Sequence, residues 1–297
     1  MNPELLDTTA AAQMFMDVMK AEYQGRQYLT GIGEDHDMVG TTLNIPILES
    51  VEMTDRGFTS GDLPITTIGR RNVTVTTHDK ALKSTIGDAY ATQFLPSLVM
   101  NESKAHILGA ARQVDAIKLL AITSNTFNTA NNNLVAKNTE TGTRTGLTVN
   151  QIIDGQTKLE ANGYNMGSKL FMVGNAPAVR QLFYDDKFTD WDYRPERPIG
   201  ESPVNQFDEL LGMSVRKLGG SGPNTIATSG ASQETAVYLI SGDALVNGYN
   251  SHLSSAVVPE PAERRTSIVS GFVMGSAVVH PKGIIKIVCD QISTVNT

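Results

Sequence analysis

The chain has 297 residues, of which 40% are hydrophobic, with one cysteine and a formal net charge of -7 at pH 7. This length allows one large domain or two smaller ones, and the hydrophobic content is sufficient for a packed core. The acidic balance argues against a protein whose main task is binding nucleic-acid phosphates, because such binding depends on Lys and Arg, and the single cysteine excludes an intrachain disulfide.

The N-terminal segment opens with MNPELLD and holds no unbroken apolar run, so we expect neither a signal peptide nor a membrane-spanning helix. Residues 8–23 can form an amphipathic helix, which would pack on its own core or on a neighbouring molecule. The glycine-bounded run EDHD, residues 34–37, has the composition of a metal cluster. Consecutive side chains on a short loop cannot all turn inward, so we expect a solvated turn there.

Two runs, TTLNIPILESVEM and ITTIGRRNVTVTT, predict a pair of strands because their apolar residues occupy alternate positions. Pro46 inside the first run is typical of an edge strand. The turn-rich segment between them contains Phe58. A two-stranded hairpin is marginally stable alone in water. We therefore expect this hairpin to lie across another subunit, and the alternative is that it covers an edge of its own sheet.

Four cations, Arg70, Arg71, Lys80 and Lys83, form the clearest basic stretch of this acidic chain. We predict that they make contacts between subunits. An exposed, solvated strand is the alternative interpretation.

The longest segment with helical spacing spans residues 95–124 and predicts a helix about 40 Å long. Pro96 suits a first turn, where a missing N–H has no partner. Asp115 and Lys118 are expected away from the apolar face, and their three-residue spacing places opposite charges where they add slightly to helix stability. His106 is expected to be a packed or partner-facing side chain and not a base. The predicted apolar face comprises Ile107, Ala110, Ala111, Val114, Ile117 and Ala121.

A polar, Asn- and Thr-rich connector follows up to Gly146 and predicts a surface segment and a domain boundary. Thr148 and Gln151 have the spacing of a capping box at the start of the next helix, and Gly163 can end that helix. KLFMVG then predicts a buried strand, followed by a helix with Asn175 as its cap.

The rest of the chain predicts a small sheet with helices. A polar excursion that holds Trp191 and Tyr193 combines aromatic residues, charges and prolines, as contact-making loops do. AVYLISGD predicts a strand, with a helix from Ala244. The chain closes with strands on either side of Pro281, and the run IIKIVC predicts a buried thiol at Cys289.

Motifs for common enzyme chemistry are missing from the sequence. There is no Walker A loop, no His-Glu-x-x-His motif, no Cys pair and no Gly-x-Ser-x-Gly elbow, and the five histidines are scattered. We therefore expect neither an enzyme nor a bound metal or cofactor.

The order of the predicted elements resembles that of the HK97-fold major capsid proteins of tailed bacteriophages. An amphipathic N-terminal arm, an extended hairpin, a long helix, a polar connector, an α/β unit and closing strands follow one another along nearly the whole chain. The most telling local match is GSAVVHPKGIIKI, where Val278, Val279, Pro281, Ile284 and Ile285 look like the strand, proline, strand ending of this family.

The resemblance implies an α+β, HK97-like fold. By the plan of the family, residues 1–38 are the N-arm and 39–77 the E-loop, the peripheral domain holds 78–145 and 256–282 with a spine helix near 95–124, and the axial α/β domain holds 146–255 and 283–297. The residues we expect at subunit interfaces are Phe58, Arg70, Arg71, Lys80, Lys83, Trp191 and Tyr193.

The resemblance also implies that the chain assembles with itself, as pentamers and hexamers, into an icosahedral shell around double-stranded DNA, without sequence-specific DNA binding and without a membrane. The expected place is the virion capsid, assembled in the host cytoplasm. A separate scaffolding protein and a portal are expected partners, and a decoration protein is a further candidate. In the type member an E-loop lysine forms an isopeptide cross-link. Residues 40–79 here contain no lysine, so we expect noncovalent interlocking.

Three alternatives stay open at this point. An encapsulin-type compartment shares the fold, a soluble α+β enzyme would place its active site in the Trp191 loop, and a tail or other virion protein would form tubes or rings.

Overall fold

The computed structural model describes residues 27–48, 70–138, 145–164, 169–185, 209–219, 222–230 and 233–292. Within these ranges the side chains of Leu48, residues 87–100, Val257, Pro259, Pro261 and Thr266 are not described. The predicted helix over 8–23 and the residues Phe58, Trp191 and Tyr193 lie outside the described ranges.

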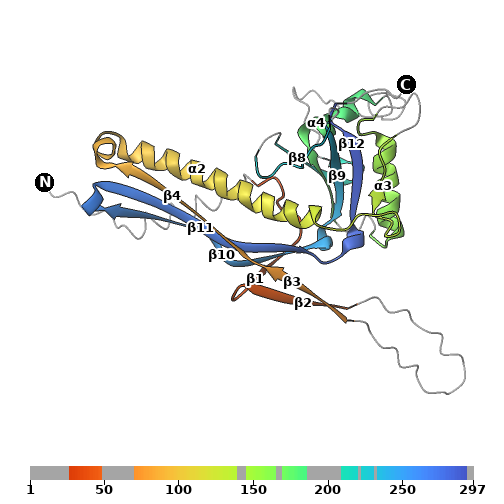
Figure 1. Ribbon diagram of the computed structural model, residues 1–297, viewed down its shortest axis with the longest axis horizontal. Coiled ribbons are helices and arrows are strands. Elements are labelled where there is room, and N and C mark those ends of the chain that lie inside the picture. Colours follow the sequence, from red (N-terminus) through yellow and green to blue (C-terminus); the bar gives the residue numbers. More distant parts are fainter. Residues whose placement is uncertain are drawn as a thin grey trace, which may run out of the picture.

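Two sheets divide the described chain into an elongated limb and a compact half (Figure 1). The limb is a four-stranded sheet of order β1-β10-β11-β4, with the long helix α2 along it. Its elements are β1 (Glu34–Asp37), β4 (His78–Gly87), α2 (Asp88–Thr123), β10 (Leu245–Glu260), η4 (Pro261–Glu263) and β11 (Arg265–Val278). A two-stranded sheet of β2 (Thr42–Leu48) and β3 (Arg70–Thr76) projects from the body.

The compact half is built on a six-stranded sheet of order β5-β12-β9-β6-β8-β7. Its strands are β5 (Leu134–Val135), β6 (Leu170–Asn175), β7 (Glu209–Leu210), β8 (Met213–Leu218), β9 (Glu234–Ser241) and β12 (Ile284–Asp290). The helices and single turns are α3 (Val149–Ala161), α4 (Ala176–Arg180), η1 (Gln181–Tyr184), η3 (Gly242–Ala244) and η5 (Pro281–Gly283).

The alternation of side chains along the strands gives the six-stranded sheet two buried faces. Met172, Leu239 and Ile287 point to the side that α3 and α4 cover. Phe171 and Tyr238, at neighbouring positions, point to the opposite side. That second face is covered by the C-terminal end of α2 and by residues 29–32, so the compact half and the limb meet in one apolar core.

The apolar face predicted for the long helix is confirmed. Its side chains pack on Tyr249, Phe272 and other residues of the limb sheet. The buried members of this face are Ile107, Ala111, Val114, Ile117 and Ala121, and Ala110 is partly buried against them.

The predicted start of this helix, near residue 95, is wrong. The helix begins at Asp88, so Pro96 lies in its interior and not in its first turn. Residues such as Ala89 and Ala91 have high helix propensity, and a proline there removes one hydrogen bond of a ladder that the rest of this 36-residue helix supplies. The helix therefore continues through Pro96.

The helix predicted from Ala244 is also wrong. Gly242–Ala244 form a single turn, and the 16-residue strand β10 follows. Successive side chains along this run lie on opposite faces, as Leu245 and Val246 do in two different apolar clusters, and pairing with β11 supplies the hydrogen bonds. The chain consequently passes from the six-stranded sheet to the four-stranded sheet at residues 242–244.

The run EDHD, expected as a turn, is the short strand β1, which pairs in parallel with residues 246–249 of β10. Its four side chains are exposed, so the solvated part of the prediction agrees with the structure. The turn assignment failed because the backbone of this run is stabilised by a distant strand, which local sequence does not reveal.

Local signals in the compact half were informative. The Thr148 and Gln151 capping box is present, and Gly163 adopts a left-handed backbone after α3, with φ +91°. Asn175 precedes α4 but makes no side-chain cap bond. Its amide donates to the Ile226 carbonyl oxygen and accepts from the Ile226 N–H, at 2.9 and 3.0 Å, so it anchors a distant loop.

Candidate subunit-interaction surfaces

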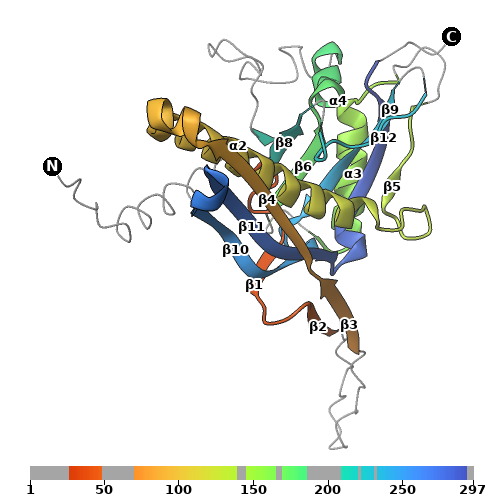
Figure 2. The same ribbon diagram turned by 60° about the vertical axis from the view of Figure 1, so that its left-hand side comes forward.

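The predicted hairpin is confirmed in its described part, where β2 and β3 pair antiparallel with Ile45 opposite Val73. At the root of the hairpin, Val75 is 0% exposed and packs with Val246 and Val279 of the body. Further out, alternate side chains of β2 are exposed, and Figures 1 and 2 show the two strands leaving the body. The described part of the hairpin is thus a projection that is fixed at its root and has exposed polar side chains further out on β2 and β3.

Two contacts fix the direction of this projection. The Arg71 guanidinium donates through Nη2 to the Val279 carbonyl oxygen at 2.5 Å. On the neighbouring strand, Gly275 lies so close to Thr76 that a Cβ at this position would collide with the Thr76 carbonyl oxygen. A side chain at Gly275 would therefore push the hairpin root away from the body.

The basic stretch does not form one patch. β3 and β4 make one extended segment, along which Arg70 and Lys83 are roughly 40 Å apart at about 3.3 Å per residue. All four cations are exposed, and Arg71 and Lys83 each also have a partner within the chain. The prediction that these cations contact another subunit stays a prediction, and the structure does not gather the four into one patch.

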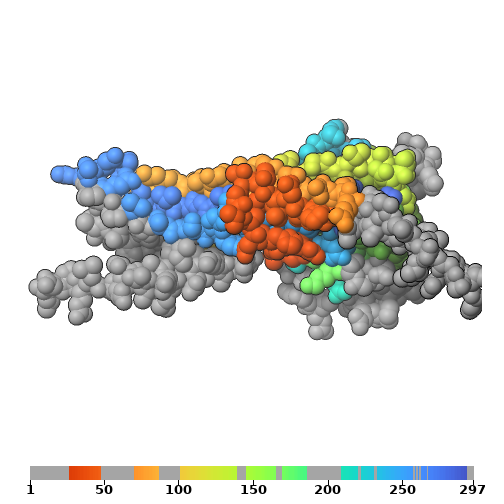
Figure 3. All heavy atoms as spheres, turned by 90° about the horizontal axis from the view of Figure 1, so that it is seen from below, coloured from red at the N-terminus to blue at the C-terminus, as the bar shows by residue number. Residues whose placement is uncertain are grey.

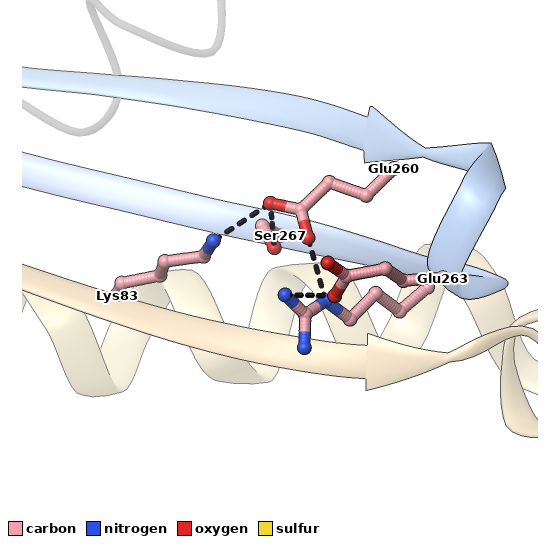
Figure 4. A network of polar contacts seen from close by, with 5 residues as sticks. Lys83, Glu260, Glu263 and Ser267 are labelled. Atoms are coloured by element: carbon pink, nitrogen blue, oxygen red, sulfur yellow. Dashed lines mark hydrogen bonds and ion pairs between the residues drawn. The ribbon is translucent and has the colours of Figure 1, made fainter.

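Lys83 belongs to a polar network at the distal end of the limb (Figure 4). Its Nζ lies 2.7 Å from Glu260 Oε1, which also accepts from the Ser267 hydroxyl at 2.9 Å. Arg265 Nε donates to Glu260 Oε2 at 2.5 Å, and Arg265 also pairs with Glu263. This network ties the turn between β10 and β11 to the edge strand β4.

The network lowers the pKa of Glu260 to about 2, because Lys83 first, and then Arg265 and Ser267, hydrogen-bond the charged carboxylate. Sequence reasoning singled out Lys83 but missed Glu260 and Arg265. The compact, charged run PEPAERR between two β-rich segments was the available signal, since it predicts a tight turn whose charges lie close together.

A cavity of about 330 Å³ opens between α2 and the limb sheet. Its walls include Leu82, Ala110, Leu253 and Phe272, with Lys80 also lining it. Leu82 is 49% exposed, which is high for a leucine in a sheet that a helix covers. This part of the limb therefore offers an apolar hollow.

His106 forms the polar side of this hollow. Its Nδ1 lies 2.9 Å from the Ser270 hydroxyl and its Nε2 lies 3.0 Å from the Ser84 hydroxyl. The side chain is 3% exposed, and burial lowers its pKa. The prediction of a packed histidine is confirmed, since His106 joins α2 to β4 and β11.

The charged residues Asp115 and Lys118, expected away from the apolar face of the helix, are buried, with 0% and 2% exposure. The expectation was wrong because the start of the described chain covers this face. Asp115 accepts the Tyr28 N–H at 2.9 Å and the Leu29 N–H at 3.0 Å, and Lys118 donates to the Leu29 carbonyl oxygen at 3.2 Å. The available signal was the position of both charges directly beside the apolar face.

The other buried titratable group noted in the sequence is Cys289, which is 0% exposed on β12. Burial is the largest cause that raises the pKa of its thiol to about 12, and the neighbouring Asp290 carboxylate adds to it. The prediction of a buried thiol is confirmed, and Cys289 is a core side chain.

A family model described as phage capsid protein matches residues 8–291. The chain belongs to the phage capsid protein family. No curated protein matches it in sequence. Among the residues that the structure describes, no helix is both long and apolar enough to cross a membrane.

Solved capsid structures share the fold of this capsid protein. The mature capsid of bacteriophage PhiM1 matches at 12% identity and a TM-score of 0.63, covering 88% of this chain and 86% of that chain. The cyanophage Pam1 capsid matches at 15% identity and a TM-score of 0.63, with 88% and 89% covered. The capsid of a native GTA particle matches at 13% identity and a TM-score of 0.62, with 89% and 90% covered.

The predicted HK97-like α+β fold is therefore confirmed, and so is the function of a phage major capsid protein. The comparisons favour neither the encapsulin-type compartment nor the enzyme. The chain is a structural protein that associates with itself in a capsid, and its place is the virion.

Proposed function

We propose that this capsid protein assembles as pentamers and hexamers into a closed icosahedral shell around double-stranded DNA, and that assembly takes place in the host cytoplasm. The family match over residues 8–291 supports a shell subunit. The net charge of -7 fits a container that encloses DNA without binding tightly to it.

In this proposal the six-stranded sheet with α3 and α4 is the axial domain, and the limb with the spine helix α2 is the peripheral domain. The sheet topology supports placing residues 245–255 with the limb, because β10 pairs with β1 and β11 along this stretch. Residues 1–38 serve as the N-arm and 39–77 as the E-loop.

The observation that carries the proposal is the hairpin. Its root is fixed by Val75 and Arg71, while its outer strands carry exposed polar side chains away from the body. Such a projection gains its stabilisation from a surface outside its own subunit. Many weak contacts of this kind, repeated around a shell, give a stable cage through effective concentration.

The proposed interface residues are Phe58 on the E-loop, the cations Arg70, Arg71, Lys80 and Lys83, and the aromatic residues Trp191 and Tyr193. All four cations are exposed, and Arg70 and Lys80 are the stronger candidates because Arg71 and Lys83 already bond within the chain. A separate scaffolding protein and a portal are the further partners we propose, and a decoration protein would be an additional one.

The test is negative-stain electron microscopy of the expressed protein, alone and with a candidate scaffolding protein, together with light scattering for mass. We expect closed particles of uniform size. A uniform monomer or dimer under every condition would overturn the proposal. Because residues 40–79 contain no lysine, boiling the particles in detergent should release monomers, with no covalently linked rings.

A further inference from the structure

We propose that Asp115 and Lys118 are positioning residues for the N-arm: they hold its base on the spine helix, so that residues 1–26 leave the subunit from one fixed place. This positioning serves assembly and not the stability of the fold. The link to assembly rests on the proposed shell.

The contacts are made to the main chain of the arm. The two carboxylate oxygens of Asp115 accept the Tyr28 and Leu29 N–H groups separately, and the Lys118 ammonium group donates to the Leu29 carbonyl oxygen. Three bonds from residues one helical turn apart thus fix three consecutive peptide units, from residue 27 to residue 30. We call these three hydrogen bonds from Asp115 and Lys118 the clamp. Because they bind main-chain groups, they set the path of the backbone whatever side chains the arm carries.

The surroundings of the clamp explain why its charges define one arrangement. Asp115 and Lys118 lie beside apolar residues of α2, and burial raises the pKa of Asp115 and lowers that of Lys118. A buried pair of charges contributes little net stability compared with apolar residues of similar volume, but each misplaced partner is costly. The pair therefore favours one position of the arm's main chain over other positions.

The clamp is the first of several contacts along the base of the arm. Leu29 and Ile32 are fully buried in the core between limb and compact half. Asn247 then donates to the Ile32 carbonyl oxygen at 3.0 Å and to Asp35 Oδ1 at 2.9 Å, and β1 pairs with β10. Figure 3 shows residues 27–48, in red, across the middle of one face. The later contacts hold residues 29–37 in place. The clamp therefore sets the direction only of the chain that precedes residue 29.

The decisive variant is the apolar pair Asp115→Leu with Lys118→Met. We expect it to fold with an unfolding midpoint close to that of the unmodified protein, because removal of two buried charges offsets the hydrogen bonds that Tyr28 and Leu29 lose. In the unassembled subunit, chymotrypsin should cleave after Tyr28 roughly tenfold faster than in the unmodified protein, because local opening governs cleavage. The variant should form no closed shells. The matched control is Arg112→Met, at an exposed position of the same helix, which should change none of these properties.

A second measurement covers the case in which the double variant fails to fold. In Asp115→Asn, hydrogen exchange of the Tyr28 and Leu29 amides should accelerate, while the amides of residues 34–37 keep their protection. Normal protection of both amides, or normal shell assembly by a double variant that is cleaved fast, would overturn the inference. A uniform loss of protection over the whole subunit would also overturn it, since it would assign the pair to folding.

Both readouts on unassembled subunits are independent of the proposed function. If the unmodified protein forms no shells, the proposed shell fails, while cleavage and exchange still decide whether the clamp holds the arm.

Discussion

Lys83 and Glu260 lie 2.7 Å apart at the distal end of the limb, although 177 residues separate them in the chain. Three basic or hydroxyl side chains hydrogen-bond the carboxylate, and the pKa of Glu260 falls to about 2 from an ordinary value of 4.5. The folded state therefore binds this proton more weakly than the unfolded state does.

The first prediction concerns pH. Because the folded pKa of Glu260 is depressed, its stabilisation is fully present above pH 4.5 and is lost as the pH falls through about 2. Hydrogen exchange at the β10–β11 turn should accelerate over this window. In Glu260→Gln, hydrogen exchange at this turn should already be fast at neutral pH and should no longer depend on pH. An unchanged acid profile in that variant would contradict the role of Glu260.

The second prediction concerns the root of the hairpin. Gly275→Ala should destabilise the subunit by about 1–3 kcal/mol, because the added methyl group collides with the Thr76 carbonyl oxygen and the backbone must shift. Gly109→Ala is the matched control, since a Cβ on this helical glycine meets no atom within 4 Å and should stabilise the helix by up to about 1 kcal/mol. Thermal unfolding of both variants checks this, and equal midpoints would contradict it.

The third prediction tests the apolar face of α2. Val114→Asp should abolish soluble expression, because an unpaired charge would be buried at a site with 0% exposure. Leu120→Asp is the control on the same helix, where the side chain is 60% exposed and the charge would reach water. Soluble Val114→Asp protein with a normal unfolding midpoint would show that this face is not part of the core.

The fourth prediction tests the E-loop. Deletion of residues 54–62, which lie outside the described residues, should leave the monomer folded, because Val75 and Arg71 still fix the strand root. The deleted protein should form no closed shells in electron microscopy. If shells form as before, the hairpin does not link subunits.

The sequence predicted those elements whose signals are local. The hairpin alternation, the apolar face of α2, the Thr148 capping box and the strands around Pro281 all depend on neighbours within a few residues, and the structure has them. The start of α2 was misplaced because Pro96 was interpreted as a boundary, although the rest of the helix supplies the stability that the proline removes.

The polar contacts could not be predicted from the sequence, for one common reason. Asp115 meets residues 28 and 29, Asn175 meets Ile226, and Lys83 meets Glu260, so each partner comes from a distant segment. Spacing along the chain carries no information about such pairs. The acidic run 34–37 likewise became a strand only because β10 lies beside it.

The C-terminal end of α2 lies inside the core of the compact half, with Leu119 and Ile122 packed near Phe171 and Tyr238 of the six-stranded sheet. This helix has 36 residues and is about 54 Å long at 1.5 Å per residue. Because its end packs in the core of the compact half, the limb has no hinge at that point. We therefore expect the two described halves to move together as one body. In the pentamers and hexamers that we propose, differences in curvature should then arise where subunits meet and not by bending between the two halves.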